Sequence, residues 1–375
     1  MSFDPQYPWE VLVRADERDF LELSELAARC ADPGRRYIEI RSDGWAFRFE
    51  QHEAAARFVA SPHPNKTKVI SIRRPSDRDE QVEIHANDFA FIYIDVDFPP
   101  IAWLVYRGTL NSCNVTAANP GNLSWFLLDS IKRGLVSTLR REGSLEGFRI
   151  RDFENHLSRL KCVYAYPTLE TAARGCYGQG KWRAENLVAI APIPDQFSCE
   201  THDSRWIDDF DALPVETAKR YWAGEPTKEP LTEYLLSGRF TILGTTVRQR
   251  AHDTIKRLHP NSLAILELSR LAAEFNSDFG SIAPWLVRDG GRVVVRYVIR
   301  FSEAECREII QRAVQEKQRN ANFAINMDDL EPVWNNAQSA ELDAKFSVPD
   351  FAPYEHELRQ DKLNELNEFI QAVLA

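Results

Sequence analysis

Apolar and polar residues alternate along the chain with two different periods, which together predict an α+β protein. Apolar residues three or four positions apart indicate amphipathic helices, whereas strict alternation or short β-branched and aromatic runs indicate strands. The helical period occurs in residues 20–30, 53–59, 123–133, 135–141, 169–173, 213–222, 263–275, 302–319 and 353–374. Strand-like runs occur in residues 37–40, 45–49, 69–72, 89–96, 103–109, 160–166, 186–193 and 292–301.

Two consecutive prolines, Pro99 and Pro100, predict a domain boundary, because they remove two sheet donors and stiffen the backbone. We expect an N-terminal α+β domain in residues 1–98 and a central domain in residues 99–246. A C-terminal α+β region, residues 247–375, ends in a helix that we expect to dock on the core.

Glycines and prolines predict where several elements end. Gly143 should end the helix that begins near residue 135, and the prolines around Ile193 should close the preceding strand. The glycine-containing segment 175–180 is predicted to be a flexible loop. It is not a phosphate-binding fingerprint, because it lacks the Lys-Ser/Thr ending and does not lead from a strand into a long helix.

Glu233 lies in an otherwise apolar, β-favouring run, residues 230–242. As a strand, this run would place Glu233 on one face with Leu231 and Leu235, in a wall of apolar side chains that suits a functional site. As a short helix, it would leave Glu233 an ordinary surface acid. A third interpretation is a buried glutamate in a structural ion pair.

Composition indicates a globular protein with large cores: the chain has 375 residues, of which 44% are hydrophobic and 27% are charged. No apolar stretch has bilayer-spanning length and no signal peptide is recognisable, so we expect a cytoplasmic protein without a membrane partner. The six cysteines form no Cys-x-x-Cys pair, which indicates reduced thiols. A net charge of −10 argues against nonspecific nucleic-acid binding.

The sequence predicts no metal site. Asp95 and Asp97 share a strand face, and His202 is followed by Asp203, but neither pair has a third ligand at a suitable spacing.

Four short motifs, in this order and spacing, resemble the ADP-ribosyltransferase superfamily, and most closely a little-characterised bacterial and phage branch of it. They are Tyr106-Arg107-Gly108-Thr109, Phe153-Glu154 with Leu157-Ser158-Arg159-Leu160, the segment 218–224 (AKRYWAG), and Thr232-Glu233-Tyr234-Leu235 followed by Gly238. The resemblance covers about 150 residues. It implies a central split mixed β-sheet, with NAD in its cleft, flanked by α+β regions.

The resemblance also implies roles for individual residues. Arg107, preceded by Tyr106, would grip the dinucleotide, as a guanidinium suits a pyrophosphate. Ser158 matches the superfamily's strand serine only in part, because its neighbours are leucine and arginine. Glu233 would be the catalytic glutamate. Since Leu231 stands where enzymes that modify arginine carry a glutamate or glutamine, arginine is not the expected acceptor.

Cleavage of the nicotinamide–ribose bond builds positive charge on the ribose, so a fixed carboxylate beside the sugar favours the transition state. Tyr164, Tyr166 or Trp125 would stack on the nicotinamide, and Ser158 would orient the ribose or the carboxylate. NAD would be a substrate, so neither a tightly held cofactor nor a metal is required.

The expected function is therefore mono-ADP-ribosylation of a macromolecule, either a protein or a nucleic acid. For bacterial and phage proteins the resemblance implies a toxin, a defence effector or a modifier of the host, and it leaves open whether an inhibitor protein binds. One rival is an NAD glycohydrolase that uses the same residues without an acceptor. A second rival is a non-catalytic scaffold for protein or nucleic-acid binding.

Overall fold

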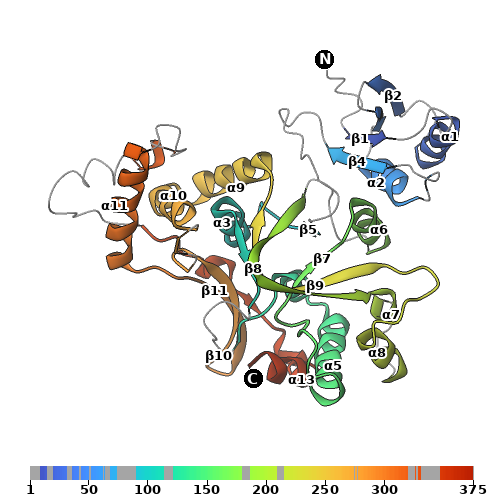
Figure 1. The fold of residues 1–375 in the computed structure, drawn as a ribbon. Coiled ribbons are helices and arrows are strands. Elements are labelled where there is room, and N and C mark those ends of the chain that lie inside the picture. Colours follow the sequence, from blue (N-terminus) through green and yellow to red (C-terminus); the bar gives the residue numbers. More distant parts are fainter. Residues whose placement is uncertain are drawn as a thin grey trace.

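The computed structural model describes residues 9–14, 20–31, 36–41, 44–49, 52–61, 63, 68–73, 90–113, 121–179, 186–208, 215–273, 275–276, 278–319, 326, 328–330 and 347–374. These residues form three antiparallel sheets with helices around them, which confirms the predicted α+β class (Figure 1).

The N-terminal sheet has the strand order β2-β3-β1-β4. Its strands are β1 (Trp9–Arg14), β2 (Arg36–Arg41), β3 (Gly44–Phe49) and β4 (Lys68–Arg73), and the helices are α1 (Phe20–Cys30) and α2 (His52–Ala60). Their apolar positions are buried together in one cluster, which also takes in α6 (Leu169–Gln179). The predicted helices and paired strands are confirmed here, while Asp43 of the predicted turn lies outside the described residues.

The central sheet has the order β5-β8-β9-β6, and β7 also pairs with β9. Its strands are β5 (Ala90–Tyr93), β6 (Thr109–Asn111), β7 (Val163–Ala165), β8 (Leu187–Asp203) and β9 (Thr232–Ile242). All its pairings are antiparallel, where a mixed sheet was expected. β8 does not close at the prolines near Ile193: it continues to Asp203, and the prolines fall where its register with β9 shifts.

Five of the described helices pack around this sheet: α3 (Pro99–Arg107), α4 (Trp125–Lys132), α5 (Val136–Asp152), α9 (Thr245–Leu258) and α10 (Leu263–Ala272). Two more helices, α7 (Arg205–Asp208) and α8 (Val215–Trp222), connect β8 to β9. α3 packs against α9 and α10, and α6 contacts α2 of the N-terminal unit (Figure 1).

The third sheet, β10-β11-β12, belongs to the C-terminal region. Its elements are β10 (Ile282–Asp289), β11 (Arg292–Ile299), α11 (Glu303–Arg319), β12 (His356–Glu357), α13 (Asn367–Leu374) and the short 3₁₀ helices Pro260–Ser262, Ala352–Tyr354 and Gln360–Lys362. The single helix expected over residues 353–374 is wrong, because only its last turns are α-helical. α13 does dock on the core as expected, with Phe369, Ile370 and Val373 buried.

One hydrophobic cluster runs from Ala90 to Val373, so the central and C-terminal regions share a core. The expected boundaries near residues 98 and 246 stay predictions.

The strand predicted over residues 103–109 is wrong, because Pro99–Arg107 form α3. Pro99 and Pro100 occupy the first turn, where a missing N–H costs nothing, so the two prolines start a helix rather than break the chain. Gly108, with a φ of 85°, ends it. α3 is buried on nearly all sides, and a continuous apolar run does not distinguish a strand from a buried helix.

Two glycines that were expected to break helices lie inside them. A Cβ on Gly143 would lie 2.7 Å from the backbone nitrogen of Phe369, and a Cβ on Gly175 would lie 2.4 Å from the hydroxyl of Tyr166. These glycines therefore permit close packing of α5 on α13 and of α6 on the segment after β7. The predicted loop 175–180 is α-helical as far as Gln179, and Gly180 lies outside the described residues.

Candidate active site

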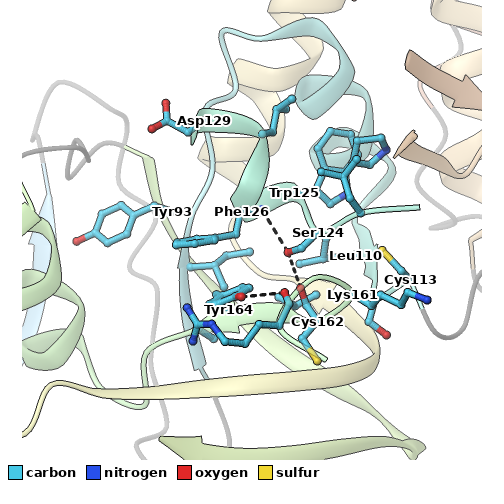
Figure 2. Close-up of a pocket in the computed structure, with 18 of the residues that line it drawn as sticks. Tyr93, Leu110, Cys113, Ser124, Trp125, Phe126, Asp129, Lys161, Cys162 and Tyr164 are labelled. Atoms are coloured by element: carbon cyan, nitrogen blue, oxygen red, sulfur yellow. Dashed lines mark hydrogen bonds between the residues drawn. The ribbon is translucent and has the colours of Figure 1, made fainter. Parts of the chain in front are cut away.

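A cavity of about 140 Å³ lies among α3, α4, α5 and strands β5, β6, β7, β9 and β10, and most of its wall is apolar (Figure 2). A cavity of this size is comparable with one that holds a single benzene ring. Its polar wall includes Ser124, Asp129, Glu142, Arg159, Tyr164 and Glu233. These side chains come from segments that are distant in sequence and that the sheet brings together.

Glu233 is the second residue of β9, and its side chain is buried. The strand interpretation is confirmed and the short helix is wrong. The ion-pair interpretation also holds, because Arg159 Nη1 donates to Glu233 Oε1. The hydroxyl of Tyr221 donates to the same oxygen at 2.7 Å. Within the described part of the chain, Glu233 Oε2 accepts no hydrogen bond.

Arg159 connects two carboxylates. It is only 2% exposed, and its Nε and Nη2 donate to the two oxygens of Glu142 at 2.8 and 3.1 Å. Complete burial by itself would lower the pKa of Arg159, but the charges of Glu142 and Glu233 raise it well above its ordinary value. Two ionised carboxylates and one guanidinium carry a net charge of −1, and the rest of the cavity wall adds two acids, Asp95 and Asp129, and three cations, Lys132, Arg141 and Lys161.

Two tyrosines complete this network. Burial raises the pKa of both Tyr164 and Tyr221 well above the ordinary value, so both stay protonated and donate. The Tyr164 hydroxyl donates to the carbonyl of Arg159 at 2.8 Å. The Tyr164 ring stacks on Phe126 with centroids 4.1 Å apart, and the Arg159 guanidinium lies 4.6 Å from its centroid (Figure 2). These two contacts hold the Tyr164 ring in place at the cavity wall.

Ser124 fixes the helix above the cavity. It is the N-cap of α4, where its Oγ accepts from the Phe126 N–H, and it donates to the carbonyl of Cys162 at 2.5 Å (Figure 2). The stacking partners suggested by the sequence are also held. Trp125 stacks on Tyr297, and Tyr166 makes an edge contact with Tyr93.

Tyr106 and Arg107 lie on α3, and neither lines this cavity, although Ile101 and Leu104 of the same helix do. The Tyr106 hydroxyl donates to Glu267 at 2.8 Å, and Arg107 donates to the Phe279 carbonyl at 3.2 Å and to the Thr109 hydroxyl. Thr109 pairs with Thr241 of β9, eight residues beyond Glu233.

Ser158 is buried in the turn before β7, but it is not among the residues that line the cavity. Its Oγ has no hydrogen-bond partner among the described residues. Of the side chains proposed from sequence, Glu233 and Tyr164 therefore meet in the cavity wall, whereas Arg107, Tyr106 and Ser158 do not line it.

Sequence reasoning missed Glu142, Arg159 and Tyr221 as members of the site. One signal could have found Glu142: it follows Leu139 by three positions, so it falls on the apolar stripe of its helix. A glutamate in that position needs a buried cation, and Arg159 is that cation.

The comparisons with known proteins add one match. A protein family of unknown function, DUF2441, matches residues 116–253, which include Glu142, Arg159, Tyr221 and Glu233 but not Arg107. No curated protein matches the chain. Among the described helices, none combines the length and the apolar character needed to cross a bilayer.

Proposed function

We propose that this chain is a mono-ADP-ribosyltransferase that transfers ADP-ribose from NAD to a macromolecule and releases nicotinamide. The observation that carries this proposal is the state of Glu233: the side chain lines a ring-sized cavity, and Arg159 and Tyr221 hold its Oε1 while Oε2 accepts no hydrogen bond from the described residues. A ribose hydroxyl is a suitable donor to that second oxygen.

The charge of the site suits this reaction. Departure of nicotinamide leaves positive charge on the ribose, and a fixed negative group beside it stabilises the transition state more than the ground state. Glu233 supplies a carboxylate charge in a buried setting, where water screens it weakly, and its ion pair with Arg159 holds it in place. In this proposal Glu233 is the catalytic carboxylate, and Glu142 and Arg159 position it.

The size of the cavity limits what it can enclose. A volume of about 140 Å³ suits the nicotinamide ring, whereas whole ligands usually occupy roughly 300–1,000 Å³. The adenylate end of NAD would therefore lie outside the cavity. We leave Arg107 and Tyr106 out of the NAD contacts because neither side chain lines the cavity. The proposal names the acceptor only as a protein or a nucleic acid. It also includes a cytoplasmic location and a role as a toxin or a defence effector.

The test uses the full chain, NAD labelled in its adenylate part, and a cell lysate separated into protein, DNA and RNA. Wild type should release nicotinamide and label one fraction. Glu233→Gln should lower turnover by about 10²–10³, the usual loss for one electrostatic group, while NAD affinity changes little. The matched control is Glu216→Gln on α8, whose exposed side chain lies outside the network.

A second variant guards against a folding defect in Glu233→Gln. Tyr221→Phe keeps the ring and removes the hydroxyl that donates to Glu233, so it should slow turnover while the chain stays folded. Nicotinamide release without a labelled macromolecule would mean that the chain hydrolyses NAD instead of transferring ADP-ribose. If wild type neither binds NAD nor releases nicotinamide, the proposal is overturned and the scaffold hypothesis replaces it.

A further inference from the structure

Three potential metal ligands meet beside the Glu233 network but are not part of it. His156, Glu200 and His202 each offer one ligand atom, and these atoms all lie within 4.8 Å of one another. Glu200 and His202 are two residues apart on β8, so they share a face, and His156 lies in the turn after α5. The sequence did not indicate a third ligand, because His156 lies far from β8 in the chain.

Asp203, the other ligand considered from sequence, points elsewhere. Its carboxylate accepts from the N–H groups of Thr227 and Leu231 at 2.7 and 2.9 Å and from the Thr227 hydroxyl at 2.7 Å. Asp203 therefore anchors the segment before β9, and His202 is the member of the pair that turns toward other ligands.

The hydrogen bond of His202 to a backbone carbonyl determines which of its ring nitrogens is available as a ligand. Its Nδ1 lies 2.9 Å from the carbonyl oxygen of Tyr221, and since a carbonyl only accepts, Nδ1 holds the proton. In the neutral ring, Nε2 then carries a lone pair, and this atom lies 3.3 Å from Glu200 Oε2. His202 is only 3% exposed. That lone pair would let Nε2 bind a metal ion, with the Glu200 carboxylate as a neighbouring ligand.

The same carboxylate oxygen attracts a second imidazole. His156 Nδ1 lies 3.1 Å from Glu200 Oε2. The backbone N–H of Leu157 donates to both oxygens of Glu200, at 3.0 and 3.1 Å, and fixes the direction of the carboxylate. Two nitrogens and one oxygen thus converge from fixed positions.

The separations suit a small transition-metal ion. With metal–ligand bonds of about 2.0–2.2 Å, neighbouring donors of a tetrahedral zinc ion lie about 3.3 Å apart. The separations from Glu200 to His202 and His156 are 3.3 and 3.1 Å. Two imidazoles with one carboxylate favour zinc and other divalent first-row transition metals over magnesium or calcium, which prefer oxygen ligands only.

We propose that His156, Glu200 and His202 bind a divalent zinc-class ion, with water in the fourth position. His156 and Glu200 are partly exposed, so solvent reaches the fourth position. The carbonyl of Tyr221 fixes His202 as a metal-ligating imidazole, in the way that outer hydrogen bonds orient such ligands.

The ion would also support the neighbouring network. It would tie the turn that carries Arg159 to β8, and the ring of His202 stacks on Tyr221 with centroids 4.7 Å apart. His202 is paired across the sheet with Glu233. The site therefore lies next to the proposed catalytic carboxylate, although the metal proposal does not depend on the reaction assigned to it.

The test measures metal binding without NAD, so its outcome is independent of the proposed function. The full chain, freed of metal with a chelator, is titrated with Zn²⁺ by calorimetry and with Co²⁺ by visible absorption. Wild type should bind one ion of each, with a tetrahedral Co²⁺ spectrum that millimolar Mg²⁺ leaves unchanged. His156→Ala, which removes a partly exposed ligand, should weaken binding by more than the tenfold to hundredfold that loss of an outer partner costs.

Two further variants decide the interpretation. Glu200→Gln keeps an acceptor for Leu157 and removes the charge, so it should also weaken binding and change the Co²⁺ spectrum. The matched control, His259→Ala, removes a partly buried histidine outside the cluster and should bind like wild type. The proposal is overturned if wild type binds no more tightly than His156→Ala, or if His259→Ala weakens binding equally.

Discussion

Arg107 and Arg159 are both 2% exposed, yet they are buried in opposite ways. Two hydrogen bonds of Arg107 go to neutral oxygens of Phe279 and Thr109, and burial, offset only in part by the charge of Asp278, lowers its pKa to about 10. Arg159 lies between Glu142 and Glu233, whose charges outweigh the effect of burial and raise its pKa. The two arginines also lie near opposite ends of β9.

This difference teaches that the partners of a buried cation decide its role. Arg107 holds α3 against the segment around Phe279, as a packing residue does. Arg159 holds two acids at the wall of a cavity, where Glu233 keeps one oxygen that accepts no hydrogen bond from the described residues. The Tyr-Arg-Gly motif thus contains an arginine that does not line the cavity, and the arginine beside the cavity lies in the motif that matched only in part.

Replacement of Arg159 should have the largest effect on stability. Arg159→Met leaves two buried carboxylates facing each other, and loss of one partner of a buried ion pair costs about 3–5 kcal/mol. Arg107→Met should cost about 1–3 kcal/mol, because it mainly removes a donor from a buried carbonyl. Urea unfolding of both variants measures the difference.

A compensated variant sharpens this comparison. Glu142→Gln and Glu233→Gln, added to Arg159→Met, remove the unpaired charges and should restore much of the lost stability. The comparison fails if Arg107→Met destabilises the chain as much as Arg159→Met does. It also fails if the compensated variant is no more stable than the single one.

Tyr106→Phe should lower the stability of the fold less than Arg159→Met does, and it should leave NAD turnover unchanged. The variant removes a hydrogen bond to the charged Glu267, worth about 1.5–3 kcal/mol. Turnover should match wild type, because Tyr106 is not among the residues that line the cavity. A large loss of turnover in a folded Tyr106→Phe variant would mean that Tyr106 contributes to NAD binding or catalysis, which contradicts this prediction.

The same variant has a defined pH dependence. Burial alone would raise the pKa of Glu267, but hydrogen bonds from Arg270, Asn326 and Tyr106, with the charge of Arg270, bring it below its ordinary value of 4.5. A carboxylate with a lowered folded-state pKa stabilises the fold above its unfolded value and loses that contribution as the pH falls. The melting-temperature gap between wild type and Tyr106→Phe should therefore be full at neutral pH and shrink below pH 4.5.

Gly143→Ala should have the smallest effect, and it tests the helix that carries Glu142. The new Cβ would meet the Phe369 backbone nitrogen at 2.7 Å. Such overpacking costs about 1–3 kcal/mol, against which the better helix propensity of alanine returns up to about 1 kcal/mol. The matched control is Gly147→Ala on the same helix, where no atom lies within 4 Å, and it should be neutral or stabilising. Thermal unfolding distinguishes the two; equal melting temperatures would mean that α5 and α13 separate easily.

Much of the secondary structure could be predicted because it depends on local periodicity. The first helix and the β2–β3 pair follow from amphipathic spacing alone. The buried elements could not be predicted in this way. α3 is apolar on nearly every side and carries no period, and the glycines of α5 and α6 mark close packing that only the facing residues reveal.

The candidate site also combines a feature that the sequence predicts with contacts that only the tertiary structure determines. That Glu233 needs a partner follows from the sequence by itself, since a charge in an apolar strand must be paired or used. Which partner it has was decided by tertiary structure: β7 and β8 both pair with β9, and the turn before β7 brings Arg159 to Glu233. His156 reaches Glu200 and His202 for the same reason. Local sequence determines which residues carry charge and which prefer strand or helix, but distances between remote residues depend on strand pairing and core packing, which no short segment encodes alone.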